Sequence, residues 1–384
     1  MPGSRNAKRR VALLMGTSPT YVRELAQGVA RHNAEHGRWV IHFERCDPDA
    51  PPPAWLKTWK GDGILVRVGN RRMARAVRDR GLPVVAFRWA IPTPGVPAIG
   101  TDQRAVAALA AEHLRQRGFR QFAAVGLARG VQPPLDERLD EFVADVRRAG
   151  LACATFTVAG DRSAPQQQQR LVRWLRTLPQ PLGILAVNDD TGLRVLNACA
   201  QARLMVPEQV AVLGAGNDDC LCNLAHPPLS SVDLSPRAIG YAAAQWLDRL
   251  MDGQPIGERE LLMPPAGIVA RRSTDVLATD DQAVVRAAAF IRDHACEGIH
   301  IADVLRHVKL SRWALEPRVK RVLGRTVYQE ILRVQIECVK ELLRATDLPI
   351  KQIAARSGFH YVQYLTRAFH RATGVTPGRF RKQA

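Results

Sequence analysis

The sequence predicts a chain of two parts: a two-lobed α/β domain built on parallel sheets, followed by an all-α domain with two helix-turn-helix units. Three observations support this prediction. Short apolar segments alternate with helical segments over about the first 260 residues, which is typical of parallel sheets covered on both faces. About the last hundred residues twice repeat a helix, a tight turn and a second helix. The formal net charge of +19 favours an anionic partner such as nucleic acid.

The predicted strands of the α/β part are short, apolar and bounded by helical segments. About 260 residues of such alternation exceed one compact sheet, so we expect two similar lobes. The expected strands are 10–15, 39–44, 63–68, 84–87, 98–102, 121–125, 152–158, 183–187 and 210–213. The expected helices are 21–35, 55–60, 71–80, 103–118, 136–149, 165–178 and 191–202.

The C-terminal part predicts helices 301–307 and 311–323 around a turn at 308–310, then a long helix over 328–346. Pro349 opens the next helix, where a missing N–H costs nothing. Ser357-Gly358 breaks that helix. The last expected helix, 361–372, has an apolar face of Tyr364, Leu365, Ala368 and Phe369. Two such units on one stiff helix can place two reading helices about one DNA turn, roughly 34 Å, apart.

Charge and cysteine usage narrow the function classes. Residues 283–384 hold 19 Lys/Arg against 8 Asp/Glu, a net charge of +11, whereas the preceding 282 residues carry +8. The seven cysteines are scattered, and only Cys220 and Cys222 are close, so we expect reduced thiols and no metal or cofactor. The apolar run Val11 to Met15 is too short for a signal peptide, and no stretch approaches a membrane span. These features predict a cytoplasmic protein.

Three C-terminal segments together resemble the AraC family DNA-binding domain. They read SRWALEPRVKRVLG, KELLRATDLPIKQIAARSGF and TRAFHRATGVTPGRFRK, and the resemblance extends over about Val284 to Lys382. It implies binding to double-stranded DNA, and activation through RNA polymerase. Residues that read bases or contact the DNA backbone are then expected on the two reading helices: Ser311, Arg312, Trp313, Glu316, Val362, Gln363, Arg367 and Arg371.

Pro317 departs from the AraC pattern, which has a basic residue at this position. A proline about six residues into a helix removes a hydrogen bond to residue 313 and clashes with its carbonyl, at roughly 3 kcal/mol. Two alternatives remain open from the sequence: a kinked helix that still reads DNA, or a helix that begins near Glu316.

The α/β part resembles the ligand-binding core of LacI-type repressors, shared with periplasmic sugar-binding proteins. Its marks, in order, are Ile99-Gly100-Thr101-Asp102, Glu137-Arg138, Ala186-Val187-Asn188-Asp189, Gly214 with Asn217-Asp218, Pro228 to Val232, Ile239-Gly240 and Met263-Pro264-Pro265. LacI-type chains carry their DNA-binding part first, whereas here it is last. This combination is similar to the xylose-responsive activators, and implies a homodimer with a sugar effector, D-xylose first.

The domain boundaries follow from these resemblances. We expect a basic tail over 1–9, a periplasmic-binding-protein-like sugar-binding domain over 10–273, a polar linker over 274–282 and the DNA-binding domain over 283–384.

Effector contacts are expected in the cleft between the lobes, at the carboxyl ends of the strands. Several candidates have an alternative role: Asn188, Asp189 and Asn217 could cap helices, and Arg138 could form a salt bridge with Asp136 or Asp140. Trp89 could be an apolar plug, and Arg67 and Arg88 could be solvated. The full candidate set is Tyr21, Arg23, Arg67, Arg88, Trp89, Arg138, Asn188, Asp189, Asn217 and Asp218.

Gly216 departs from the LacI-type pattern, which commonly has an aspartate there. A carboxylate that pairs two sugar hydroxyls would be absent, and each such bond is worth about 1.5–3 kcal/mol. Asp218 or Asp219 could compensate from a shifted loop. The sugar itself therefore stays open.

Two other function classes were weighed. An enzyme is disfavoured because the α/β part lacks a Gly-rich phosphate loop, a G-x-S-x-G motif and a metal-spaced histidine pair. A solute-binding protein for transport is disfavoured because a basic domain is attached and no signal peptide is recognisable.

Overall fold

The computed structural model describes residues 8–16, 19–47, 49–88, 91, 93–158, 163–275, 279 and 281–383. The chain forms two compact units. The first comprises residues 1–116, 120–206 and 211–275, and the second comprises residues 276–384 with the short segments 117–119 and 207–210. Each unit is described by itself.

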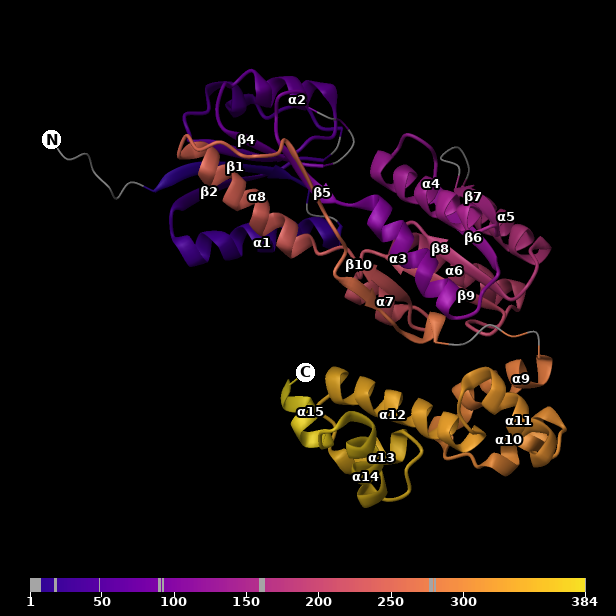
Figure 1. Cartoon of the computed structure of the whole chain (residues 1–384). Coiled ribbons are helices and arrows are strands. Elements are labelled where there is room, and N and C mark those ends of the chain that lie inside the picture. Colours follow the sequence, from indigo (N-terminus) through magenta and orange to yellow (C-terminus); the bar gives the residue numbers. More distant parts are fainter. Residues whose placement is uncertain are drawn as a thin grey trace. The chain divides into compact units, whose positions relative to one another are not determined.

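The first lobe of unit 1 is a six-stranded parallel sheet in the order β11-β5-β4-β3-β1-β2. One face packs on α1 and α8, and the other packs on α2 and a 3₁₀ turn at Ala54–Thr58, so the lobe has a core on each face (Figure 1). The bounds are β1 Arg9–Met15, α1 Thr20–His36, β2 Trp39–Arg45, β3 Gly63–Arg67, α2 Arg71–Arg78, β4 Val84–Phe87, β5 Ala98–Thr101, α8 Pro236–Met251 and β11 Glu260–Met263.

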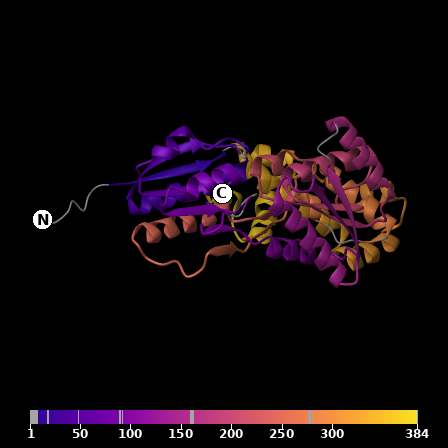
Figure 2. The same cartoon turned by 90° about the horizontal axis from the view of Figure 1, so that it is seen from above.

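The second lobe is a six-stranded sheet in the order β12-β10-β9-β8-β6-β7, in which β12 pairs antiparallel with β10. Helix α3 packs against α4, and α5 packs against α6. The bounds are α3 Gln103–Gln116, β6 Gln121–Leu127, α4 Pro133–Arg148, β7 Ala152–Val158, α5 Ala164–Thr177, β8 Leu182–Ala186, α6 Asp189–Ala202, β9 Val210–Ala215, α7 Asp219–Leu224, β10 Ser230–Asp233 and β12 Gly267–Val269. Figure 2 shows the two lobes as separate groups of strands.

The chain passes between the lobes three times: after β5, after β10 and between β11 and β12. Helix α8 and strand β11 therefore complete the first lobe although they follow the second in sequence. The predicted two-lobed parallel α/β fold is confirmed. Strands β10, β11 and β12 were not predicted, because three or four residues carry too little periodicity, and the helix expected over 55–60 is the 3₁₀ turn.

Unit 2 contains two helical cores that share α12. The N-terminal end of this helix packs with α9, α10 and α11, and its C-terminal half packs with α13 and α14. The fold therefore has the predicted form of two helix-turn-helix units on one long helix. The bounds are α9 Gln282–His294, α10 Ile301–Val308, α11 Arg312–Leu323, α12 Val327–Ala345, α13 Ile350–Arg356, α14 Val362–Thr373 and α15 Pro377–Gln383.

The turns of the two units differ in their chemistry. Lys309 takes a left-handed conformation with φ of 57° after α10. Gly358 has φ of +77°, and a Cβ at this position would lie 2.5 Å from the Ala295 carbonyl oxygen. Glycine is therefore required at the second turn both by conformation and by space.

Helix α11 runs without interruption from Arg312 to Leu323 with Pro317 inside it. The alternative of a helix that begins near Glu316 is therefore wrong. Tyr364 was expected on an apolar face, but its side chain is 46% exposed and its hydroxyl is hydrogen-bonded to that of Tyr328.

The predicted domain boundaries are only partly covered by the structure. Most of the basic tail, at 1–7, and the linker residues 276–278 and 280 lie outside the described residues. No helix in the described part of the chain is long and apolar enough to cross a membrane.

Candidate functional sites

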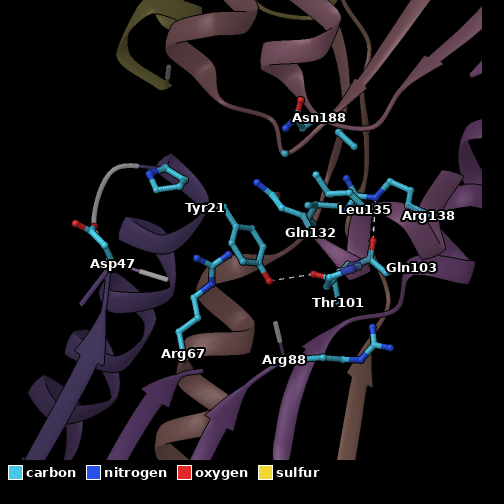
Figure 3. Close-up of a pocket in the computed structure, with 16 residues that line it drawn as sticks. Tyr21, Asp47, Arg67, Arg88, Thr101, Gln103, Gln132, Leu135, Arg138 and Asn188 are labelled. Atoms are coloured by element: carbon cyan, nitrogen blue, oxygen red, sulfur yellow. Dashed lines mark hydrogen bonds between the residues drawn. The ribbon is translucent and has the colours of Figure 1, made fainter. Parts of the chain in front are cut away.

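A cavity of about 360 Å³ lies between the two lobes of unit 1 (Figure 3). Arg67 and Thr101 end their strands, and Gly216 follows β9 directly. The cavity therefore sits at the carboxyl ends of parallel strands, where α/β folds place ligands. It is lined by Gly16, Pro19, Tyr21, Asp47, Arg67, Arg88, Thr101, Gln103, Gln132, Pro134, Leu135, Arg138, Asn188, Ala215, Gly216 and Leu234.

Tyr21 enters the cavity from the first turn of α1. Its hydroxyl lies 3.2 Å from the Thr101 hydroxyl, and burial raises the pKa of Tyr21 above its usual value. The phenol therefore stays protonated at neutral pH, and its ring supplies an apolar surface in the centre of the cavity (Figure 3).

Arg138 reaches the cavity from α4 and is only 2% exposed. Its Nε donates to Gln103 Oε1 at 2.9 Å and its Nη1 donates to the Val187 carbonyl at 2.5 Å. The alternative that it pairs with Asp136 or Asp140 is not seen, since both acids face Arg129. Burial lowers the pKa of Arg138 to about 10, so the side chain remains charged.

The other two arginines of the lining differ from each other. Arg67 ends β3, and burial lowers its pKa to about 10. Arg88 follows β4 and forms ion pairs with Glu137 at 2.8 Å and with Glu260 at 3.1 Å. Arg88 thus links the first lobe to α4 of the second.

The floor of the cavity is built around a buried carboxylate. Asp189 is 3% exposed; it accepts hydrogen bonds from the Ser231 hydroxyl at 2.5 Å and from the Asp218 backbone N–H at 2.8 Å. Burial raises the pKa of this carboxyl group. Asp189 lies beneath Gly214 and Gly216 and does not line the cavity. Asn188 both caps α6, through the Thr191 N–H at 2.9 Å, and lines the cavity.

Arg23, Asn217 and Asp218 were also predicted as effector contacts, and they are not among the residues that line the cavity. Arg23 is exposed on α1 and donates to Thr20 at 2.7 Å. Asn217 accepts from Arg271 at 3.1 Å. Asp218 caps α7 and accepts from the Thr20 hydroxyl at 2.5 Å. Trp89 lies outside the described residues.

Several lining residues were not foreseen. Thr101 and Gln103 stand at the end of β5 and the start of α3, so the strand-end rule could have found them. Gln132 and Leu135 belong to the start of α4, and no local pattern in the sequence marks them.

The candidate DNA-reading surface of the second unit is the solvent face of α14. Gln363, Arg367 and Arg371 are exposed there, whereas Val362 is half-buried against the core. Amide and guanidinium groups on one helix face can pair with base edges and phosphates.

The start of α11 forms the corresponding surface of the first unit. Ser311 caps the helix by accepting from the Ala314 N–H at 3.2 Å, and Trp313 is 89% exposed. Arg312 is exposed and lies 3.7 Å from Glu316, whose carboxylate also accepts from the Val327 N–H at 3.2 Å. Glu316 therefore stabilises the start of α12 and also lies next to the candidate DNA-reading surface of α11.

Two families of known domains match this chain. Residues 111–274 match the periplasmic binding protein-like domain, and residues 304–383 match a helix-turn-helix domain. The xylose operon regulatory protein of Escherichia coli K12 is 32% identical over 390 residues, with 97% of each chain covered. This chain belongs to the family of xylose operon regulators. The regulator of Haemophilus influenzae is 31% identical, with 97% of this chain and 98% of the relative covered.

A solved structure of the same family agrees with the fold. The structure described as the xylose-binding transcription activator xylR has a TM-score of 0.80 at 30% identity, with 98% of each chain covered. A CelR–cellobiose complex, at 20% identity and a TM-score of 0.56, shares the fold of 69% of this chain. The xylose operon regulators thus contain both domains in the order found here, which confirms the predicted sugar-responsive DNA-binding transcription regulator. The relatives are regulators, which also confirms that the chain is not an enzyme.

Proposed function

We propose that this chain controls genes of xylose use in the cytoplasm, and that a pentose-type effector bound in the inter-lobe cavity changes its action on DNA. The observation that supports this most is the cavity itself, which combines side chains from both lobes at the strand ends. The names of the family members make D-xylose the first effector to test.

The effector would act by favouring the closed arrangement of the lobes. Tyr21 and Arg67 come from the first lobe, and Arg138 and Asn188 come from the second, so one small molecule can contact both. A ligand shifts such an equilibrium only by its difference in affinity for the two states. Contacts from both lobes supply that difference, because they can all form at once only in the closed state.

The DNA would be read by both helix-turn-helix units. Gln363 and Arg367 are suited to pair with adenine and guanine in the major groove, and Arg371 with phosphate. Ser311, Arg312 and Trp313 would meet the groove or the backbone at the start of α11. A homodimer would present four such units, and activation would require contact with RNA polymerase.

The test is binding of the purified full chain to promoter DNA, measured by fluorescence anisotropy at about 150 mM salt. We expect preference for DNA upstream of the xylose genes of its source over a scrambled sequence, and a change in affinity with D-xylose, L-arabinose or D-ribose. A thermal-shift panel checks the effector, since a ligand at 100 times its Kd stabilises by about 2.7 kcal/mol. Equal affinity for promoter and scrambled DNA would contradict the proposal.

A further inference from the structure

Gln335 lies near the middle of α12, between the two helical cores of unit 2. The preceding residue, Val334, belongs to the core of the first helix-turn-helix unit, and the next residue, Ile336, belongs to the core of the second. The Gln335 side chain is 7% exposed. The amide of a buried glutamine needs hydrogen-bond partners, and this position puts partners from both helix-turn-helix units within its reach.

The Gln335 amide joins backbone groups of the two helix-turn-helix units. Its Nε2 donates to the Ala295 carbonyl at 2.9 Å, at the end of α9. It also donates to the Gly358 carbonyl at 3.4 Å, in the turn between α13 and α14. Both partners are carbonyl oxygens, which only accept hydrogen bonds. One side chain of α12 therefore bridges the segment between α9 and α10 to the turn of the second unit.

The two bridged segments also approach each other directly. Gly298 and Gly358 take left-handed conformations, with φ of +81° and +77°. A Cβ on Gly358 would lie 2.9 Å from the Gly298 backbone nitrogen and 2.7 Å from Gln335 Nε2. A Cβ on Gly298 would lie 3.5 Å from the Gly358 carbonyl oxygen. Glycine at both positions thus allows the main chains of the two units to meet beside the Gln335 amide.

A cavity of about 410 Å³ lies next to this junction. Ile299 lines it from the first helix-turn-helix unit and Phe359 lines it from the second. Tyr328 of α12 and Tyr364 of α14 also line it, and their hydroxyl groups are hydrogen-bonded to each other. Because side chains on opposite sides of a cavity do not hold each other in place, the relative orientation of the two units depends strongly on α12 and on these bridges.

We propose that Gln335 is a positioning residue that sets the spacing between the two DNA segments read by α11 and α14. Each helix-turn-helix unit packs on α12 through its own core, and the amide bridge fixes how the units are turned relative to each other around this helix. This inference deepens the proposed function, since it assumes that both units read DNA.

The geometry of the duplex gives the spacing its meaning. Two reading helices on one face of DNA meet major-groove segments about one turn, roughly 34 Å, apart. One added base pair moves the second segment by about 3.4 Å and rotates it by about 35° around the duplex. A bridged pair of units cannot follow this change, whereas a pair that turns freely around α12 can follow it. The bridge therefore makes spacing part of the sequence preference.

The test begins with selection of duplexes from a random-sequence pool by the purified full chain, so it does not depend on a xylose promoter. Sequences selected by the wild type should contain two segments at one fixed spacing. Fluorescence anisotropy then compares a selected duplex with duplexes that have one base pair added or removed between the two segments. We expect the wild type to lose affinity about tenfold or more for each change.

Variants of Gln335 separate the bridge from the volume of the side chain. Gln335→Met keeps a side chain of similar length but removes both donors. It should lose less than about threefold on the changed spacings, relative to its own affinity for the selected duplex, because the units are no longer held in one orientation. Gln335→Lys, whose ammonium group can donate to both carbonyls, should retain the spacing preference.

The matched control is Gln282→Met, which makes the same substitution at an exposed position at the start of α9. It should retain the spacing preference of the wild type. Far-UV circular dichroism establishes that each variant is folded. If Gln335→Met does not fold, Gln335→Ala replaces it, because the shorter side chain leaves room for water at the two carbonyls. A purely structural defect lowers affinity equally at all three spacings, whereas loss of the bridge reduces the difference between them.

The outcomes separate this inference from the proposed function. An equal spacing preference in the wild type and in Gln335→Met overturns it, and so does a wild type that binds all three spacings equally. Selected sequences with a single segment also overturn it, since α11 and α14 would then not both read DNA. A fixed spacing that Gln335→Met loses, in a chain that does not prefer the promoter of the xylose genes, supports the inference and contradicts the proposed function.

Discussion

The Asp189 carboxylate accepts a hydrogen bond from the Ser231 hydroxyl at 2.5 Å, and the Asp218 backbone N–H donates to it at 2.8 Å. These two bonds join α6 to β10 and to Asp218, the N-cap residue of α7. They hold the loop after β9, including Gly216, at the edge of the effector cavity. Asp189 thus shapes the floor from below.

We predict that Asp189→Asn lowers the free energy of unfolding of unit 1 by about 1–3 kcal/mol at pH 5. The amide nitrogen that replaces one carboxyl oxygen cannot accept a hydrogen bond, so either the Ser231 hydroxyl or the Asp218 N–H loses its acceptor. Urea unfolding followed by tryptophan fluorescence measures this well, since six of the seven tryptophans lie in unit 1. The neighbour Asp190, 57% exposed and paired with Arg194, gives the matched control Asp190→Asn. The control should change stability by less than about 0.5 kcal/mol. If both variants lower the stability equally, Asp189 does not hold the floor of the cavity as described.

We also predict that the difference in unfolding free energy between wild type and Asp189→Asn depends on pH. Burial raises the pKa of Asp189, so the folded chain retains a proton that the unfolded chain releases near the usual aspartate value of about 4. The stability from this group is therefore complete below that value and is lost as pH rises through the raised pKa. Asparagine does not titrate, so the stability gap between wild type and Asp189→Asn should narrow from pH 4 to pH 7.5. A gap that widens with pH would show that the carboxylate is stabilised as an anion.

We predict that Gly216→Ala lowers the free energy of unfolding by about 1–3 kcal/mol, since φ of +136° is strained for any side chain. The new methyl group would also press on Asp189 Oδ2 and displace the floor, so effector affinity should fall with stability. Gly257→Ala is the control, because a Cβ there meets nothing within 4 Å and its φ is ordinary. Calorimetry with the effector measures both effects in one sample. Retained stability and affinity in Gly216→Ala would mean that the loop is not held as described.

The cavity residues show what the sequence could and could not predict. Tyr21, Arg67, Arg88, Arg138 and Asn188 were predicted and line the cavity, because the ends of parallel strands converge in any such fold. The directions of the side chains could not be predicted.

Asp189, Asn217 and Asp218 follow strand ends too, yet their side chains turn to caps, backbone groups and Arg271. Asp218 is a local cap, since it accepts from the Leu221 N–H three residues on. The partners of Asp189 and Asn217, by contrast, lie about 30 to 50 residues away in sequence, and no local pattern reveals them. The passages of the chain between the lobes could not be predicted either, because β11 and β12 have only four and three residues.

Pro317 stands inside α11, where it cannot donate to the Trp313 carbonyl. We predict that Pro317→Ala stabilises unit 2 by about 1–3 kcal/mol, measured as slower hydrogen exchange of the α11 amides in the full chain. Pro349→Ala is the control, because Pro349 is exposed at the cap of α13 and interrupts no helix bond. Unchanged exchange in Pro317→Ala would show that the surrounding core already accommodates the proline without cost.

Arg367 is exposed at the middle of α14, on the face that carries Gln363 and Arg371. We predict that Arg367→Ala weakens promoter binding by about 1–3 kcal/mol and relaxes preference at one base position, as expected for a guanidinium paired with guanine. Arg286→Ala on α9 removes the same charge from an exposed position outside both helix-turn-helix units, and should cost less. Anisotropy with single-base variants of the promoter distinguishes the two roles of Arg367. If affinity falls equally for all sequences, and the slope of log affinity against log salt concentration decreases by about one, Arg367 is a phosphate contact.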